Sequence, residues 1–322
     1  MERKYSVILG NLGNTRDRFC NSYKDNISTT EMFKQAAKIP HIKGIELVGT
    51  WDVSPDNVKQ MKKNFIDSGL QCVSLIPDLF ANKRFWKGSF SSKDGQIRRY
   101  ALEYTKQICD VAIELGCELI NLWPGQDGYD YLLTADYEQE RQWLCDAISE
   151  LARAYPKLKF ALEYKPKEPR THSYIARMAD TLLLVQETCS ENVGVTIDTG
   201  HAFNAGETIA ESIVLAKRAG NKLFHMHFND NYTAWDDDMI VGSVHSIQYI
   251  ETLYWLDKCG YQGWLSMDQY PYREDAVGAI SESILWLRKF DDIVNSNRSK
   301  LDEIIKFGDA VETSRFLRSI LA

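Results

Sequence analysis

Short apolar segments alternate along the chain with longer amphipathic segments. The short segments are rich in β-branched side chains and mostly apolar on both faces, a pattern typical of buried parallel strands. Eight segments fit this description: YSVILG from Tyr5, GIELV from Gly44, QCVSLI from Gln71, CELINLW from Cys117, KFALEY from Lys159, VGVTI from Val193, KLFHMHF from Lys222 and GWLSM from Gly263.

The segments between these strands repeat apolar residues at helical spacing. In DNVKQMKKNFIDSGL the apolar positions are Val58, Met61, Phe65 and Leu70, and a glycine near the end is a common helix stop. The segments EYTKQICDVAIELG, EQERQWLCDAISELARAY, TIAESIVLAKRAG and SIQYIETLYWLDKCG are similar.

Uninterrupted strand–helix alternation predicts an α/β fold, a (β/α)8 TIM barrel in a single domain over residues 1–292. A doubly wound sheet is the alternative, but no GxGxxG follows the first strand. Residues 293–322 predict an extra C-terminal helix, packed on the barrel or on a neighbouring subunit.

Composition and charge narrow the class of protein. The net charge of −7 disfavours nucleic acid as a partner, because nucleic-acid-binding proteins usually carry a basic face. The seven cysteines include no CxxC pair, which indicates reduced thiols rather than a disulfide framework. No apolar run approaches the roughly 18 residues of a membrane span, and the N-terminal run is too short for a signal peptide. We therefore expect a cytoplasmic protein with no membrane partner.

Ionisable side chains lie at the ends of four consecutive predicted strands. They are Glu163, Asp198, His227 and Asp268. In a TIM barrel the carboxyl ends of the strands converge at one mouth, and carboxylates this close repel each other unless a cation neutralises them. An oxygen-rich set with one imidazole suits Mn²⁺, Mg²⁺ or Co²⁺. The sequence therefore predicts a divalent metal site, with Mn²⁺ as the expected ion.

Further ligands lie close to the first set. His201, Asp236 and Asp238 are positioned to build a second metal site beside it. His225 shares a strand face with His227, since side chains alternate with period two. We expect His227 to be the ligand because it stands nearer the strand end, and His225 to support it or to pack in the core. His172 and His245 are expected in loops or behind the ligands.

Three motifs in the second half of the chain resemble a known family. EYKPKEP resembles the E-x-K-P-x-E-P motif of xylose isomerases, DTGH resembles their acidic-x-x-His pair, and DDDMIVGS resembles their D-x-D segment. Asp198 in place of glutamate, together with WDDDMIVGSVH and MDQ, is similar to L-rhamnose isomerases and their short relatives. The resemblance covers residues 159–275.

This resemblance implies a metal-dependent sugar isomerase or epimerase that moves hydrogen next to a sugar carbonyl. It implies that Glu163, Asp198, His227 and Asp268 hold a structural metal, and that His201, Asp236 and Asp238 hold a catalytic metal. Lys165 matches the lysine that reaches the substrate carbonyl oxygen. The expected catalytic residues are therefore Lys165, Glu163, Asp268 and His201, and by analogy a homo-oligomer is expected.

Two departures from the family pattern leave other functions open. The chain is short, and no histidine matches the catalytic one near strand two or three, since His41 precedes strand two. A catalytic α subunit of a C-glycoside deglycosidase, which performs metal-dependent elimination on a 3-oxo-glycoside with a small β partner, is the main alternative. A three-zinc DNA-repair endonuclease disagrees with the acidic charge and the six histidines. A sugar-binding barrel without catalysis is the remaining alternative.

The residues expected to bind a small sugar or glycoside follow other strands. Trp123 and Gln126 come after strand four, and aromatic rings at a barrel mouth can stack on sugars. Glu46 on strand two is expected to hydrogen-bond a hydroxyl. Arg170 follows strand five and is expected to meet a phosphate or carboxylate, with a solvated salt bridge as the alternative.

Overall fold

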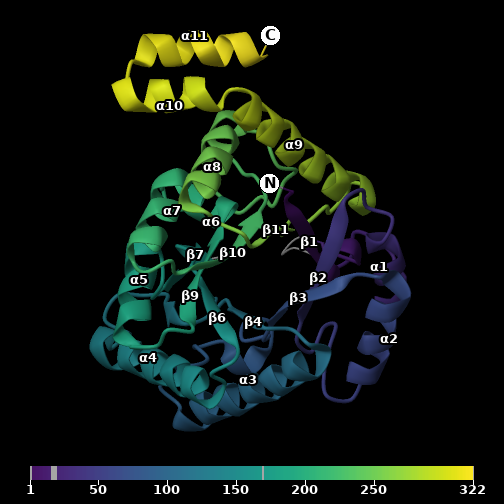
Figure 1. The fold of residues 1–322 in the computed structure, drawn as a ribbon. Helices are drawn as coiled ribbons and strands as arrows, with labels where there is room; N and C mark the ends of the chain where they lie inside the picture. The colour runs from purple at the N-terminus through teal and green to yellow at the C-terminus, as the bar shows by residue number, and fades with distance from the viewer. Residues whose placement is uncertain (1, 16–19, 169, 322) are drawn as a thin grey trace.

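The computed structural model describes residues 2–15, 20–168 and 170–321 of the chain. Eight parallel strands close into a barrel in the order β1-β11-β10-β9-β6-β4-β3-β2 (Figure 1). This confirms the predicted (β/α)8 TIM barrel, and each predicted apolar segment forms one of its strands. Their bounds are β1 (Lys4–Ile8), β2 (Ile42–Val48), β3 (Gln71–Ile76), β4 (Leu119–Leu122), β6 (Lys159–Glu163), β9 (Val193–Asp198), β10 (Leu223–Phe228) and β11 (Trp264–Met267).

Helices surround the barrel and cover the outer faces of its strands (Figure 1). They are α1 (Thr29–Ala36), α2 (Val58–Ser68), α3 (Gly95–Leu115), α4 (Tyr137–Ala154), α5 (Met178–Glu187), α7 (Ile209–Arg218), α8 (Ser246–Cys259) and α9 (Ala276–Ser296). Three of them end as predicted, at Gly69, Gly116 and Gly260, which adopt the left-handed conformation with φ of 69°, 72° and 74°. Among the described residues, no helix combines the length and apolar character that crossing a bilayer requires.

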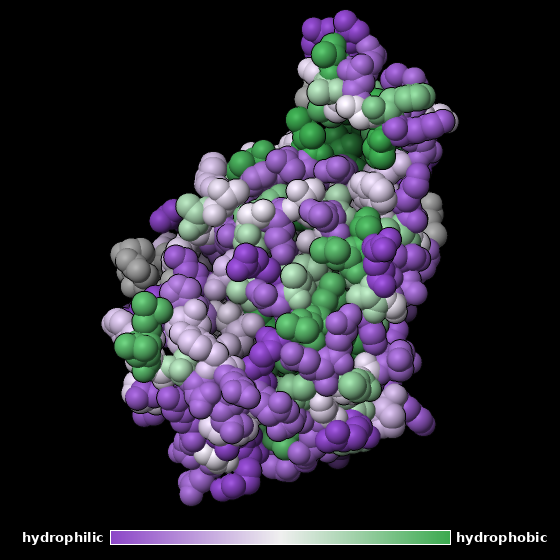
Figure 2. All heavy atoms as spheres, turned by 90° about the vertical axis from the view of Figure 1, so that its left-hand side faces the viewer, coloured by the Kyte–Doolittle hydropathy of each residue, from purple (hydrophilic) through white to green (hydrophobic). Residues whose placement is uncertain are grey.

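The C-terminal tail consists of two helices where one was expected. The predicted boundary at residue 292 lies inside α9, which ends at Ser296. The division of the chain into a barrel and a C-terminal extension stays a prediction. Gly308, with φ of 66°, ends α10 (Arg298–Phe307) before α11 (Ala310–Leu321). The pair projects from the side of the barrel (Figure 1). Asp302 anchors α10 by accepting hydrogen bonds from Tyr254 and Lys258 on α8. Figure 2 shows hydrophobic side chains gathered where the projection joins the barrel.

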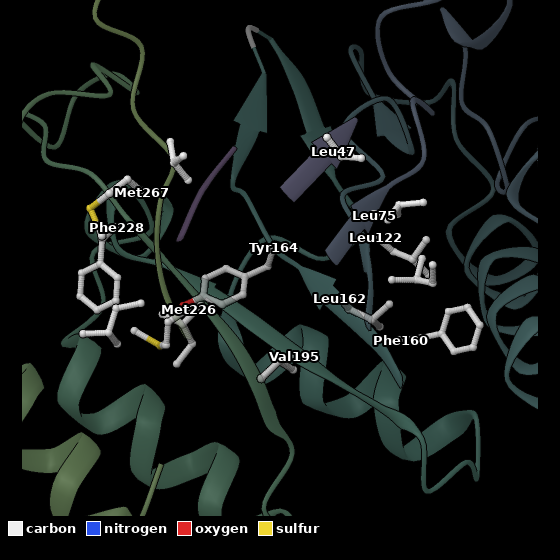
Figure 3. Close-up of a cluster of buried hydrophobic side chains, with 14 of the residues drawn as sticks. Leu47, Leu75, Leu122, Phe160, Leu162, Tyr164, Val195, Met226, Phe228 and Met267 are labelled. Carbon is white, nitrogen blue, oxygen red and sulfur yellow. The ribbon is translucent and has the colours of Figure 1, made fainter. Parts of the chain in front are cut away.

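The strands alternate between an apolar outer face and a polar inner face. Figure 3 shows the outer layer, in which residues such as Leu47, Leu75 and Met226 form a buried hydrophobic cluster. On the inner face, Glu46 of β2 contacts His225 of β10 at 2.9 Å, although these strands are not neighbours, so the contact crosses the barrel interior. The interpretation that both faces are apolar is therefore wrong. Buried polar residues line the interior: Ser6, Glu46, Ser74, Asn121, Thr196, His225, His227 and Ser266.

Smaller elements flank the carboxyl ends of the strands. The 3-10 turn η1 (Leu9–Leu12) follows β1, and the turn η2 (Lys83–Phe85) lies between β3 and α3. A three-stranded antiparallel sheet consists of β5 (Gly128–Tyr129), β8 (Thr171–Ser173) and β7 (Lys167–Glu168). The short helix α6 (Thr199–Asn204) starts directly after β9, and Asp198 caps it by accepting a hydrogen bond from the His201 backbone N–H. This cap fixes the spacing between Asp198 and His201.

Candidate metal site and active site

The four residues expected at the strand ends converge at one point. Glu163 ends β6, Asp198 ends β9, His227 lies on β10 and Asp268 follows β11. One ligand atom from each lies within 4.8 Å of those of the other three. The carboxylates and the imidazole of this set are buried except Asp268, which is partly exposed. We call these four residues the primary cluster.

A second group of ligand atoms adjoins the primary cluster and shares Asp198 with it. Its other members are His201 and Asp236, again within 4.8 Å of one another. Nδ1 of His201 and Oδ1 of Asp236 are buried, and neither makes a hydrogen bond to the described residues. A cation would pair both atoms, so these residues fit a second metal. Asp238 is not part of this group, but burial and the negative charges of the nearby Asp236 and Asp268 raise the pKa of its carboxyl.

Amide side chains hold one oxygen of each carboxylate in the primary cluster. Asn121 donates to Oε2 of Glu163 at 2.6 Å and accepts from Thr196 at 2.6 Å. Asn229 donates to Oδ2 of Asp198 at 2.9 Å. Asn11 donates to Oδ1 of Asp268 at 3.5 Å. The opposite oxygens of Glu163 and Asp268 face His227 Nδ1 at 3.2 and 3.3 Å, so these two carboxylates are directed toward the His227 ring.

These supporting asparagines were missed in the sequence analysis. Asn121 interrupts the apolar run LINL of β4, and Asn229 comes directly after β10. A polar residue inside an otherwise apolar strand was the available signal, because a buried amide must find hydrogen-bond partners.

Crowding shifts the pKa values of the site in opposite directions. Burial raises the pKa of Asp198 to about 6 against the effect of His201. Burial also opposes ionisation of Glu163, but His227 and His201 lower its pKa to about 2. Burial lowers the pKa of His201, while Asp198 and Asp236 outweigh this effect and raise it to about 9. Burial and the neighbouring Asp236 and Asp268 hold the pKa of Asp238 well above its usual range. Burial and mutual repulsion thus raise the pKa values of Asp198 and Asp238, and a cation would relieve this repulsion.

Lys165 lies on the segment after β6 and points into the site. Its Nζ is 2.8 Å from Oδ2 of Asp236 and also pairs with Glu168. Burial works to lower the pKa of this lysine, but Asp236, Glu168 and Asp238 outweigh burial and raise it. Lys165 is therefore a charged donor rather than a base.

An aromatic wall borders the ligand residues. The Trp123 ring stacks against the His201 ring with centroids 6.5 Å apart, and Lys165 Nζ lies 5.2 Å from the Trp123 ring. Phe80 packs on Trp123 at 4.4 Å, and Trp51 packs on Phe80 at 5.7 Å. Trp123 thus lies where a pocket residue was expected. Phe80, in the loop after β3, was not among the predicted pocket residues.

A family model described as "Xylose isomerase-like TIM barrel" matches residues 33–290. The chain belongs to this family. It is similar to the xylose isomerase of Thermus thermophilus, with 28% identity over 293 residues that cover 86% of this chain and 75% of that protein. The xylose isomerase of Brucella suis is 29% identical over 191 residues, covering 57% of this chain and 43% of that protein.

Solved structures of the same fold carry epimerase names. The structure of a D-tagatose 3-epimerase-like protein has a TM-score of 0.71 at 21% identity, covering 91% of this chain and 99% of that chain. The structure of 3-keto-D-glucoside 4-epimerase from E. coli has a TM-score of 0.70 at 18% identity, covering 89% and 99%. At these identities the likeness establishes the fold of this xylose isomerase-like chain.

Glu46 lies beneath the primary cluster rather than at the mouth of the barrel. Its side chain is fully buried, and its two oxygens contact His225, His227, Ser74 and Ser266. No oxygen remains for a sugar hydroxyl, so the expected role in substrate binding is not compatible with this position.

The other expected pocket residues are at the edges of the site. Gln126 is partly buried and donates to the Phe80 carbonyl at 3.3 Å, so it supports the aromatic wall. Arg170 is exposed and pairs with Asp130 at 2.7 Å, which matches the alternative of a solvated salt bridge. No described contact brings Arg170 to the primary cluster, and we do not assign it to the pocket.

The remaining histidines lie outside the primary cluster. His41 is exposed just before β2, at the opposite end of the barrel from the strand carboxyl ends. His172 stacks on Tyr129, and His245 pairs with Asp230 at 2.7 Å and stacks on Phe203. None of these three histidines lies where the family places its catalytic histidine, near strand two or three.

Proposed function

We propose that this protein is a divalent-metal-dependent sugar isomerase or epimerase that moves hydrogen next to a sugar carbonyl. The observation that carries the proposal is the primary cluster, in which three carboxylates and one imidazole converge at the mouth of a xylose isomerase-like barrel. Xylose isomerases among its relatives and epimerases among its structural neighbours support the same reaction class.

The primary cluster would hold one divalent ion, with Mn²⁺ favoured by the oxygen-rich donor set. His201 and Asp236 would hold a second ion, and we propose Asp238 as its further ligand. When bound, such a metal polarises a carbonyl and acidifies the hydroxyl beside it. The buried ammonium of Lys165, fixed by Asp236 at 2.8 Å, would donate a hydrogen bond to the substrate oxygen that gains negative charge.

Two carboxylates of the primary cluster are the candidates for proton transfer at carbon. Glu163 and Asp268 come from β6 and β11, which are separated in the barrel by β9 and β10. Both place an oxygen within 3.3 Å of the same His227 nitrogen. Carboxylates that approach one point from separate strands can remove a proton and return one to a neighbouring position.

The charge around the site favours an uncharged sugar. Lys165 lies beside the aromatic wall, and its partners Asp236 and Glu168 already neutralise its charge. The phosphate of a phosphorylated sugar would face the carboxylates of the site. Arg170 would not neutralise it, because Arg170 is paired with Asp130. An apolar sugar face can instead stack on Trp123.

The test combines metal content with product analysis in D₂O. Wild-type protein reconstituted with Mn²⁺ is incubated with D-xylose, D-fructose, D-tagatose and D-psicose, and products are identified by NMR. We expect bound Mn²⁺, an isomerised or epimerised product, and deuterium next to the carbonyl. Asp198→Asn should lose both metal and activity, while Asp52→Asn, a buried carboxylate outside the cluster, should keep both. No metal binding after reconstitution would contradict the proposal.

A parallel incubation of the Mn²⁺-reconstituted protein with a 3-oxo-glycoside tests the main alternative. Release of the aglycone from a 3-oxo-glycoside, together with inactivity on free sugars, would indicate metal-dependent elimination of the C-glycoside deglycosidase kind. A small β subunit and a homo-oligomer stay predictions, tested by co-purification and by mass measurement in solution. A cytoplasmic location also stays a prediction.

A further inference from the structure

Glu46 is enclosed by four hydrogen-bond donors in the middle of the barrel. Oε1 accepts from His225 Nε2 at 2.9 Å and from the Ser266 hydroxyl. Oε2 faces His227 Nε2 at 3.3 Å and accepts from the Ser74 hydroxyl. All five side chains are fully buried. Each oxygen thus faces one histidine and one serine, so Glu46 serves only as an acceptor.

His227 lies between this acceptor and the primary cluster. Its Nε2 faces Glu46, while its Nδ1 faces Oε1 of Glu163 at 3.2 Å and Oδ2 of Asp268 at 3.3 Å. An imidazole binds a metal through a nitrogen that carries no hydrogen, and the other nitrogen then carries one. A carboxylate behind the ring selects which nitrogen is which.

His225 gives the arrangement its rigidity. The ring of His225 meets that of His227 edge to face, with centroids 4.9 Å apart and an interplanar angle of 83°. Its Nε2 is directed to Glu46, and its Nδ1 is buried without a hydrogen bond to the described residues. His225 is therefore held by Glu46 and in turn limits rotation of the His227 ring.

We infer that Glu46 is a positioning residue for the metal site: it accepts the Nε2–H of His227 and so presents Nδ1 of that ring to the ion. This inference rests on the proposed function, because it assumes that the primary cluster binds a divalent metal. It assigns to a residue on β2 a part in a site whose ligands come from β6, β9, β10 and the segment after β11.

The test measures Mn²⁺ affinity by titration calorimetry and the visible spectrum of the Co²⁺-loaded protein. Glu46→Leu removes the acceptor and should raise the Mn²⁺ Kd by about 10- to 100-fold, the range typical of lost support behind a metal-bound histidine. Its Co²⁺ bands should shift because the His227 ring is free to turn. Glu46→Gln keeps one carbonyl oxygen and should lose less affinity than Glu46→Leu.

Asp52→Leu and Asp52→Asn are the matched controls. Asp52 is also a buried carboxylate and accepts a hydrogen bond from the backbone N–H of Val48, the last residue of β2, at 2.9 Å. These controls should retain the wild-type Kd and Co²⁺ spectrum even if their melting temperature falls. A role of Glu46 in folding alone would lower the melting temperature without changing either metal readout.

Wild-type Kd and spectrum in Glu46→Leu would overturn the inference while leaving the proposed function standing. Should the leucine variant not fold, Glu46→Gln decides: its Kd should rise by at least about threefold with altered Co²⁺ bands, and an unchanged Kd and spectrum would overturn the inference. Absence of Mn²⁺ binding by the wild-type protein would instead count against the proposed function.

Discussion

Gly200 stands in α6 between the two ligands Asp198 and His201, where space is restricted. A Cβ at this position would lie 2.1 Å from Oδ1 of Asn229 and 3.0 Å from Oδ1 of Asp236. Asn229 is fully buried, and its Nδ2 donates to Asp198. We predict that Gly200→Ala displaces the Asn229 amide from Asp198, and so weakens both the fold and the metal site.

The expected change in the free energy of unfolding combines one stabilising effect and two destabilising effects. Alanine gains about 1 kcal/mol over glycine within a helix. Extra volume in a well-packed interior costs about 1–3 kcal/mol. Loss of a hydrogen bond to a charged carboxylate costs about 1.5–3 kcal/mol. The net effect is a decrease in the free energy of unfolding of roughly 1.5–5 kcal/mol.

Urea unfolding in the presence of EDTA measures this loss without bound metal, and calorimetric titration with Mn²⁺ measures the affinity. Gly206→Ala is the control, because Gly206 has φ of 71° and open space around its Cβ position. It should cost about 1–2 kcal/mol from the left-handed backbone alone and leave the Mn²⁺ Kd unchanged. A Gly200→Ala variant with wild-type stability and wild-type Mn²⁺ affinity would refute the reasoning that Asn229 holds Asp198.

Three further predictions concern the metal, the pH dependence and the aromatic wall. Free Mn²⁺ at a hundred times its Kd should stabilise the protein by about 2.7 kcal/mol, measured as a rise in melting temperature that EDTA reverses and Asp198→Asn lacks. Burial raises the pKa of Asp52 from 3.8 to about 7, so the native state keeps a proton that the unfolded chain has released. The free energy of unfolding should therefore fall by about 1–4 kcal/mol as the pH rises from 3.8 to about 7, and then level off. If Asp52→Asn shows the same dependence of unfolding free energy on pH as the wild-type protein in urea titrations, this assignment is contradicted. Trp123→Ala should raise KM for the active sugar by about 5- to 10-fold, the loss of one stacked ring, with Mn²⁺ Kd unchanged; an unaltered KM would remove Trp123 from the pocket.

The sequence predicts the barrel and the central ligands because both depend on local signals. Strand ends in a barrel meet by topology, so Glu163, Asp198, His227 and Asp268 can be brought together without knowledge of any side-chain contact. The Asp198–His201 spacing is likewise local, since both residues belong to one capped turn. Trp123 follows the end of β4 by one residue and is placed by the same rule.

Contacts across the barrel could not be predicted in this way. Glu46 and His227 are separated by 181 residues, and whether a polar side chain on a strand faces substrate or lies beneath the site depends on its depth along the strand. Asn121 and Asn229 act through hydrogen bonds to ligands on other strands. Arg170 shows the opposite error: its position after β6 suggested the pocket, but the β7–β8 hairpin carries it to the surface.

The polar lining of the barrel also constrains how the strands can assemble. Side chains alternate across a strand, so a shift of β2 or β10 by one residue would turn Glu46, His225 and His227 toward the apolar layer of the helices. It would also place Leu47 and Met226 against the serines and Asn121 of the interior. Such a shift would leave several charged or polar groups buried without partners, each at a cost of about 1–3 kcal/mol or more. The buried polar residues that hold and position the proposed ligand His227 therefore also specify strand registration, and selection for the chemistry preserves the correct closure of the barrel.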